Sequence, residues 1–330
     1  MKKLKAARVL VAKLMVSGGL LAYFLTRIDL ERFLGTLAAA DFSYIVLALG
    51  VYLTTQTISA ARWAVLARPL GFEIRFRNFL VYYLIGMFFN LFAPGTVGGD
   101  VSRVYYLARD GRQSRAGGGA GSTLHSVVSV LMDRAVGMVV LLWLGALGLA
   151  LFPQFAVPAA IRSLTFALAG AGAVAAVLVP FVRLVLPPNG HALVKKLRIA
   201  LGGYRDRVRS IPQAVLLSFV AHVMQAWMHV VMGWALHVEI PFAYAIILYP
   251  LVGAFSAIPV SLNGIGLREG GYIFMLGVIG FGSETGIAFG LLLLLIVAVD
   301  SLIGGVVFLL RRGPAPAVMA AEAEIRSDSV

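Results

Sequence analysis

The sequence has 330 residues, of which 60% are hydrophobic and only 13% are charged, and its formal net charge is +13. Its mean hydropathy is +0.91. A soluble domain of this length needs far more polar surface, so the composition predicts an all-α polytopic membrane protein. The absence of cysteine excludes disulfides, thiolate metal sites and cysteine nucleophiles.

The N-terminal segment starts MKKLKAARVL and is basic before an apolar run, as a signal peptide is. No small-residue cleavage site follows before Arg27, so we expect residues 9–26 to form an uncleaved membrane helix. A spanning helix needs about 20 mostly apolar residues. Five later stretches approach this length: residues 43–60, 135–152, 163–182, 211–236 and 285–310. Together with residues 9–26 they predict about six full transmembrane helices.

The 28 Lys and Arg residues are concentrated between these apolar stretches. Basic loops remain in the cytoplasm, so their distribution predicts cytoplasmic N- and C-termini. We expect the membrane to be a bacterial plasma (inner) membrane. No nucleic-acid recognition motif accompanies the charge, and we expect no nucleic-acid partner. We expect one integral membrane domain over residues 1–312 and a disordered cytoplasmic tail over residues 313–330.

Two further apolar stretches, residues 78–108 and 242–282, are interrupted by glycine and proline. If residues 78–93 simply crossed the membrane, the following loop with three arginines would lie outside, against the charge rule. A re-entrant helical hairpin removes the conflict, since arms of about 12–15 residues reach past the middle of a core about 30 Å thick. The alternative is eight or more ordinary transmembrane helices with an exception to the rule.

The order of helices and hairpins then repeats upside down, with halves at about residues 8–152 and 160–310. The two hairpin tips are alike, because Arg103 and Arg268 stand at the same distance after Pro94 and Pro259. Inverted repeats whose broken helices meet near the midplane are typical of secondary transporters.

The tips have the chemistry of a headgroup site. Glycines allow close backbone approach, the free N–H groups of a starting helix favour an anion, and an arginine fork suits phosphate or carboxylate. We favour a backbone-satisfying role for Asn90 and Asn263. The predicted substrate-binding residues are Asn90, Pro94, Gly95, Gly98, Gly99, Asp100, Arg103, Asn263, Gly264, Gly266, Arg268 and Glu269.

Purely structural roles remain open for the charged members of this set. Asp100 follows a glycine and precedes a helical run, so it can be an N-cap. Arg103 can be a topology anchor at the inner interface. Arg268 and Glu269 can form a local structural pair.

Asp133, Arg134 and Asp300 are predicted coupling or gating residues. Asp300 lies a little past the middle of the last helix, where an ionisable side chain needs a partner or water. It is either a proton-coupled site or counter-ion, or part of a static ion pair with Arg268 or Arg103. We interpret Asp133 and Arg134 as an interfacial pair whose location suits a gate.

His222, Gln225 and His229 share one helical face. Two histidines seven residues apart form a poor metal site, so we expect interhelical hydrogen bonds instead. No metal ion or other cofactor is predicted.

Three motifs, NLFAPGTVGGDVSR, VLMDRAVGMVVLL and IPVSLNGIGLREGGY, occur in this order. With them the sequence resembles the lysylphosphatidylglycerol synthase transmembrane family, also called the flippase-like domain, over residues 8–311. In longer members this region moves an aminoacylated phospholipid between leaflets, and a soluble domain makes that lipid. The sequence ends soon after its last apolar stretch, so we expect no synthase domain. Many relatives carry Glu where this chain has Asp133.

The resemblance implies a lipid flippase that binds a polar, anionic or aminoacylated headgroup at the hairpin tips. Stand-alone relatives are associated with hopanoid and glycolipid pathways, so the expected partners are membrane lipids of the phospholipid, aminoacyl-lipid, hopanoid or glycolipid class. One alternative is a non-catalytic accessory subunit that presents lipid to a pathway enzyme. Another is an integral-membrane lipid-phosphate enzyme, for which the sequence offers no catalytic cluster.

Overall fold

The structure is a computed structural model. It describes residues 30–92, 98–113, 123–178, 209–258, 260–261 and 264–311, together with Met15, Gly18, Gly19, Tyr23, Thr26 and Tyr204. Most of the predicted first helix, residues 9–26, and the predicted tail, residues 313–330, therefore lie outside the described residues.

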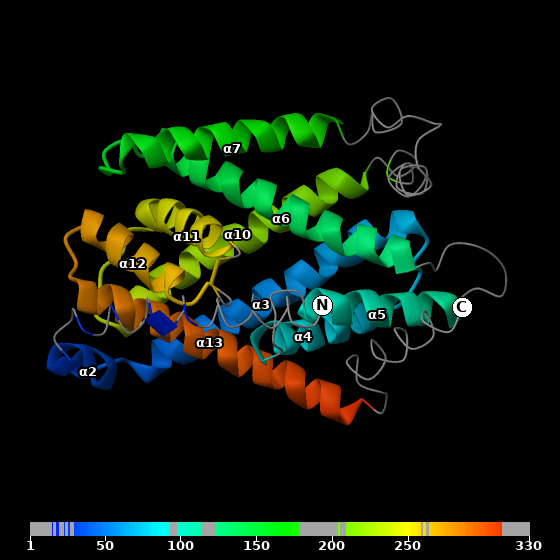
Figure 1. Ribbon diagram of the computed structural model, residues 1–330, viewed down its shortest axis with the longest axis horizontal. Coiled ribbons are helices and arrows are strands. Elements are labelled where there is room, and N and C mark those ends of the chain that lie inside the picture. Colours follow the sequence, from blue (N-terminus) through cyan, green and yellow to red (C-terminus); the bar gives the residue numbers. More distant parts are fainter. Residues whose placement is uncertain are drawn as a thin grey trace.

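The described residues form helices and no strand (Figure 1). The helices are α2 (Leu30–Ala38), α3 (Phe42–Ala67) with the 3-10 turn η1 (Arg68–Leu70), α4 (Phe76–Phe92), α5 (Gly98–Gln113), α6 (Thr123–Leu151), α7 (Ala159–Leu178), α10 (Ser210–Ala235), α11 (Phe242–Ser256), α12 (Leu267–Val278) and α13 (Ser283–Leu310).

Five of these elements are long and apolar enough to cross a membrane: α3 with η1, α6, α7, α10 and α13. Each overlaps one predicted span, which confirms an all-helical integral membrane protein. Helix α3 continues to Ala67, seven residues beyond the predicted end at residue 60. Helix α6 starts at Thr123, earlier than the apolar stretch at 135–152 indicated, because its polar first turns are helical too. Helices α4 and α11 are apolar but shorter, with 17 and 15 residues.

The helices pack in two matching sets. Each helix of the first half has a counterpart in the second: α3 matches α10, α4 matches α11, α5 matches α12 and α6 matches α13. The pair α3–α10 joins the two halves and is its own counterpart. The other packed pairs of the first set are α4–α5, α5–α6, α3–α4, α4–α13, α3–α6 and α3–α13, and their counterparts in the same order are α11–α12, α12–α13, α10–α11, α6–α11, α10–α13 and α6–α10. The sequence halves therefore build equivalent packing arrangements.

Glycines permit the closest of these helix contacts. A Cβ atom at Gly304 of α13 would lie 2.0 Å from the carbonyl oxygen of Leu84 in α4. In the matching pair, a Cβ at Gly148 of α6 would lie 2.9 Å from a side-chain carbon of Ile247 in α11. Small residues are the usual means by which membrane helices approach closely. These contacts fix α4 and α11 against the helices that flank the cavity described next.

Candidate functional site

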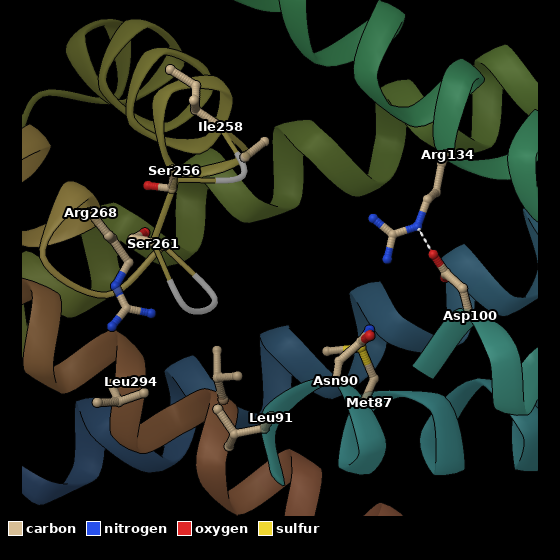
Figure 2. Close-up of a pocket in the computed structure, with 13 residues that line it drawn as sticks. Met87, Asn90, Leu91, Asp100, Arg134, Ser256, Ile258, Ser261, Arg268 and Leu294 are labelled. Carbon is tan, nitrogen blue, oxygen red and sulfur yellow. Dashed lines mark ion pairs between the residues drawn. The ribbon is translucent and has the colours of Figure 1, made fainter. Parts of the chain in front are cut away.

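A cavity of about 440 Å³ is lined by described residues that flank the two predicted hairpin tips. The end of α4 and the start of α5 line one side, and the end of α11 with the start of α12 lines the other (Figure 2). Helices α6 and α13 contribute the remaining wall. The structure therefore brings together segments far apart in the sequence, and the polar lining residues are Asn90, Asp100, Arg134, Ser256, Ser261 and Arg268.

The first tip is held by a contact between α4 and α5. The Oδ1 atom of Asn90 accepts a hydrogen bond of 3.1 Å from the backbone N–H of Gly99. A Cβ atom at Gly99 would lie 2.1 Å from the carbonyl oxygen of Gly86, so only glycine fits there. Asn90 satisfies a free backbone donor at the start of α5, which is the role that the sequence favoured.

Asp100 lies within the first turn of α5, since that helix begins at Gly98. It is therefore not the N-cap residue, and that interpretation is wrong. Its carboxylate forms an ion pair with Arg134 of α6, and Figure 2 shows the two side chains meeting at the cavity wall. The Arg134 side chain is 51% exposed, so this pair is accessible from the cavity.

Asp133 is buried and is held by two arginines. Its Oδ1 atom lies 2.7 Å from Nε of Arg62, and its Oδ2 atom lies 2.7 Å from Nη2 of Arg103. Arg62 also donates a hydrogen bond of 3.0 Å to the hydroxyl of Ser218. The predicted interfacial pair of Asp133 with Arg134 is wrong, because neighbouring helical residues point about 100° apart and these two reach different partners.

The structure buries Arg103 among the helices and pairs it with Asp133. Its interpretation as a topology anchor at the inner interface stays a prediction. Its side chain is 7% exposed. The guanidinium carbon lies 4.2 Å from the ring centre of Trp63 and 4.6 Å from that of Tyr83. Cation–π contacts of this kind hold a desolvated guanidinium firmly.

Together these side chains form a chain of alternating charge, defined here as the ion-pair chain: Arg62, Asp133, Arg103, Asp100 and Arg134. Its inner members are buried, and its outer end opens on the cavity at Arg134. An anion that enters the cavity would therefore meet a guanidinium whose counter-ion is the carboxylate of Asp100.

The second tip is organised by Glu269. Its Oε2 atom accepts a hydrogen bond of 2.6 Å from the N–H of Gly266, and its Oε1 atom lies 2.7 Å from Nη2 of Arg268. Gly264 and Gly266 have φ values of +76° and +86°, which favour glycine. The expected local pair of Arg268 and Glu269 is confirmed. Arg268 nonetheless lines the cavity (Figure 2).

Four predicted positions at the tips, Pro94, Gly95, Pro259 and Asn263, lie outside the described residues. Gly98 begins α5. Asp300 is fully buried in α13, and neither carboxylate oxygen has a hydrogen-bond partner among the described residues. Its expected ion pair with Arg268 or Arg103 is therefore wrong, because those arginines pair with Glu269 and with the two aspartates of the ion-pair chain.

The polar residues of α10 form interhelical hydrogen bonds, as expected. His222 Nδ1 lies 2.8 Å from the hydroxyl of Tyr249 in α11, and His229 Nε2 lies 2.8 Å from the hydroxyl of Tyr272 in α12. Gln225 donates a bond of 2.8 Å to Thr55 in α3. Within the described part of the chain, no group of three His, Cys, Asp or Glu residues is placed to hold a metal ion.

Arg62 is the site residue that sequence reasoning missed. The sequence placed it in a basic loop, whereas the structure buries it in α3 with 6% exposure. The signal available was its position in the helical run SAARWAVLA, where its neighbours are apolar.

Residues 10–304 match the family described as the lysylphosphatidylglycerol synthase TM region. Among curated proteins, a segment of 83 residues is 30% identical to the UPF0104 membrane protein MJ1595 of Methanocaldococcus jannaschii. That segment covers 25% of this chain and 25% of that relative. The chain therefore matches about a quarter of the length of the archaeal protein.

Proposed function

Because the chain belongs to the lysylphosphatidylglycerol synthase TM region family, as its three motifs indicated, we propose that it binds the polar headgroup of a membrane lipid between its two tips and moves that lipid between leaflets. One observation carries this proposal. A cavity of about 440 Å³ inside an apolar helical protein is lined by Asp100, Arg134 and Arg268. Ionisable side chains within membrane helices usually mark a pathway for a substrate or ion.

The proposal includes the arrangement in the membrane. We take α4 with α5 and α11 with α12 as re-entrant hairpins in inverted halves, with both termini cytoplasmic in a bacterial inner membrane. Helices of 17 and 15 residues extend roughly 25 and 22 Å, which is less than a core about 30 Å thick. Both tips would then end within the membrane, beside the cavity.

The ligand chemistry follows from the lining residues. Arg134 and Arg268 present two guanidinium groups to one cavity, and each can hold phosphate oxygens through paired hydrogen bonds. An aminoacylated headgroup adds an ammonium group, for which Asp100 is the available carboxylate. Binding sites for small ligands measure roughly 300–1,000 Å³, so the cavity suits a headgroup while the acyl chains remain in the bilayer.

Headgroup binding changes the ion-pair chain at its exposed end. A lipid phosphate competes with Asp100 for Arg134, because both are anions that bind the same guanidinium. The Arg134–Asp100 pair joins α6 to α5, so its exchange for a ligand frees the first tip to move. In this mechanism, binding of the headgroup breaks the ion pair that holds α5 against α6 and so widens the cavity for the headgroup to pass.

Translocation in proteoliposomes tests the function. Vesicles would carry fluorescent phosphatidylglycerol or lysylphosphatidylglycerol, and a membrane-impermeant quencher would report the fraction in the outer leaflet with time. Arg134→Gln and Arg268→Gln should each slow exchange about tenfold or more, since a hydrogen bond to a charged group contributes about 1.5–3 kcal/mol. Arg77→Gln, at an exposed arginine of α4, is the matched control and should leave the rate unchanged.

The wild type decides the proposal. Exchange no faster than in protein-free vesicles, with phospholipid, aminoacylated, isoprenoid-linked and glycolipid probes alike, would rule it out. Lipid that co-purifies under those conditions, together with a stable partner enzyme, would point to the accessory subunit. Product formation by the purified protein, lost in Asp100→Asn, would point to the lipid-phosphate enzyme.

A further inference from the structure

Among the buried acids that the structure describes, Asp133, Glu269 and Asp300, only Asp300 lacks a partner. Its side chain in α13 has 0% exposure, and neither carboxylate oxygen has a hydrogen-bond partner in the described part of the chain. An ionised carboxylate in such an environment is strongly destabilised, whereas a neutral carboxylic acid is not. The lipid-binding function proposed above makes no use of this residue.

Within the described part of the chain, no cation forms an ion pair with Asp300. Asp300 acts electrostatically on Tyr52 of α3, as do three further groups: Tyr83 of α4, Tyr249 of α11 and Arg268 of α12. The charge of Arg268 is already paired with Glu269. Of the other helices packed on α13, α10 presents His229, which packs against Phe289 and bonds to Tyr272, and α2 carries the exposed Glu31.

Asp133 provides an internal comparison on the matching helix. Helices α6 and α13 correspond in the packing of the two halves. Asp133 has two arginine nitrogens at 2.7 Å, which keep its carboxylate ionised and fixed. Asp300 has no such neighbour. The two halves therefore contain one acid in an ion-pair chain and one acid that has no ion pair among the described residues.

Asp300 also lies in the contact that links α13 to the cavity. The hydroxyl of the next residue, Ser301, donates a hydrogen bond of 3.3 Å to the carbonyl oxygen of Met87 in α4. One turn earlier Val297 lines the cavity, as Met87 does. One turn later Gly304 lies directly against α4. A charge on Asp300 would need water to enter between α4 and α13, and that would displace the wall of the cavity.

We propose that Asp300 is a proton-binding site whose protonation keeps the α4–α13 contact closed and whose deprotonation loosens it, so that lipid movement is coupled to a proton gradient. This inference rests on the proposed function for its coupled step. The neutral acid gives its proton to water on one side of the membrane and, as a carboxylate, accepts a proton from the other side.

Infrared spectroscopy tests the proton site independently of transport. The protein, purified in detergent and labelled with carbon-13 on aspartate carboxyl groups, would be titrated across neutral pH. The wild type should show the C=O band of a protonated aspartic acid at neutral pH, and Asp300→Asn, which is nearly isosteric, should lack that band. Asp300→Glu should restore an acid band at the unlabelled glutamate frequency. Identical aspartic acid bands in wild type and Asp300→Asn would overturn the proposal.

The coupling is tested in the proteoliposomes, with phosphatidylglycerol as the probe and the membrane potential clamped. An imposed pH gradient should change the wild-type rate by about fivefold or more, within the usual range for coupled sites. The rate of Asp300→Asn should not respond to the gradient, while the response of Arg77→Gln should match the wild type.

The outcomes separate the two proposals. Wild-type exchange that ignores the pH gradient, or that follows a sodium gradient instead, refutes proton coupling and leaves the lipid function standing. Absence of any exchange refutes the lipid function, and the infrared band then decides the proton site alone.

Discussion

Replacing Asp133 with Asn should strongly destabilise the protein. Asp133 is 1% exposed, and its two oxygens each lie 2.7 Å from an arginine nitrogen, of Arg62 and Arg103. Asp133→Asn preserves the shape but leaves two buried guanidinium groups without this counter-ion. Removing one partner of a buried ion pair costs about 3–5 kcal/mol, and we expect a loss of that size in the free energy of unfolding.

Reversible unfolding by SDS in mixed lipid–detergent micelles, followed by circular dichroism, measures this loss. The matched control is Asp41→Asn, the same chemical change at the N-cap of α3, where Oδ1 accepts a bond of 2.8 Å from the N–H of Ser43. Asn caps a helix about as well as Asp, so the control should shift the free energy of unfolding by only a few tenths of a kcal/mol. If Asp133→Asn stays within about 1 kcal/mol of the wild type, the ion-pair chain is not a stabilising core and the reasoning fails.

Two further predictions use the same unfolding assay. Gly99→Ala should lower the free energy of unfolding by about 1–3 kcal/mol, because its Cβ would overlap the carbonyl oxygen of Gly86. The control Gly170→Ala, whose Cβ would have nothing within 4 Å, should stay within about 1 kcal/mol of the wild type. Equal losses in the two variants would contradict the close contact at Gly99. Tyr272→Phe removes the hydroxyl at 2.8 Å from His229 Nε2 and should cost about 0.6–1.7 kcal/mol, and an unchanged free energy of unfolding would contradict this bond.

The membrane spans could be predicted because the bilayer requires one property of them, apolar side chains on the lipid-facing surface. Every residue facing the bilayer must be apolar, so hydropathy alone locates α3, α7, α10 and α13. The same reasoning misplaced the start of α6. Its first turns include Ser129 and Asp133, whose side chains bind Trp63 of α3 and two arginines on other helices, and hydropathy cannot detect that compensation.

The candidate site was predictable only where its residues are close in sequence. Glycines, an acid and an arginine within one tip indicated a broken backbone with charge, and the contact of Asn90 with Gly99 follows from that proximity. The ion-pair partner of each charged side chain depends on the tertiary packing, which the sequence does not reveal. Arg62 and Asp133 are 71 residues apart, so the interpretation of a basic segment as a topology signal concealed a residue of the ion-pair chain.

The structure distributes its ion pairs unevenly over two similarly packed halves, and this bears on which helix moves. Helix α6 is tied to α3 and α5 through Asp133, whereas the matching α13 has no ion pair at Asp300. At its far end α13 is anchored instead, since the guanidinium of Arg311 lies 4.6 Å from the ring centre of Tyr82 and donates a hydrogen bond of 3.0 Å to its hydroxyl. Among the described ion pairs, therefore, none holds α13 at Asp300, although its glycines pack closely on α4. The proton exchange proposed above for Asp300 would act at this uncompensated point of the α4–α13 contact, beside the cavity.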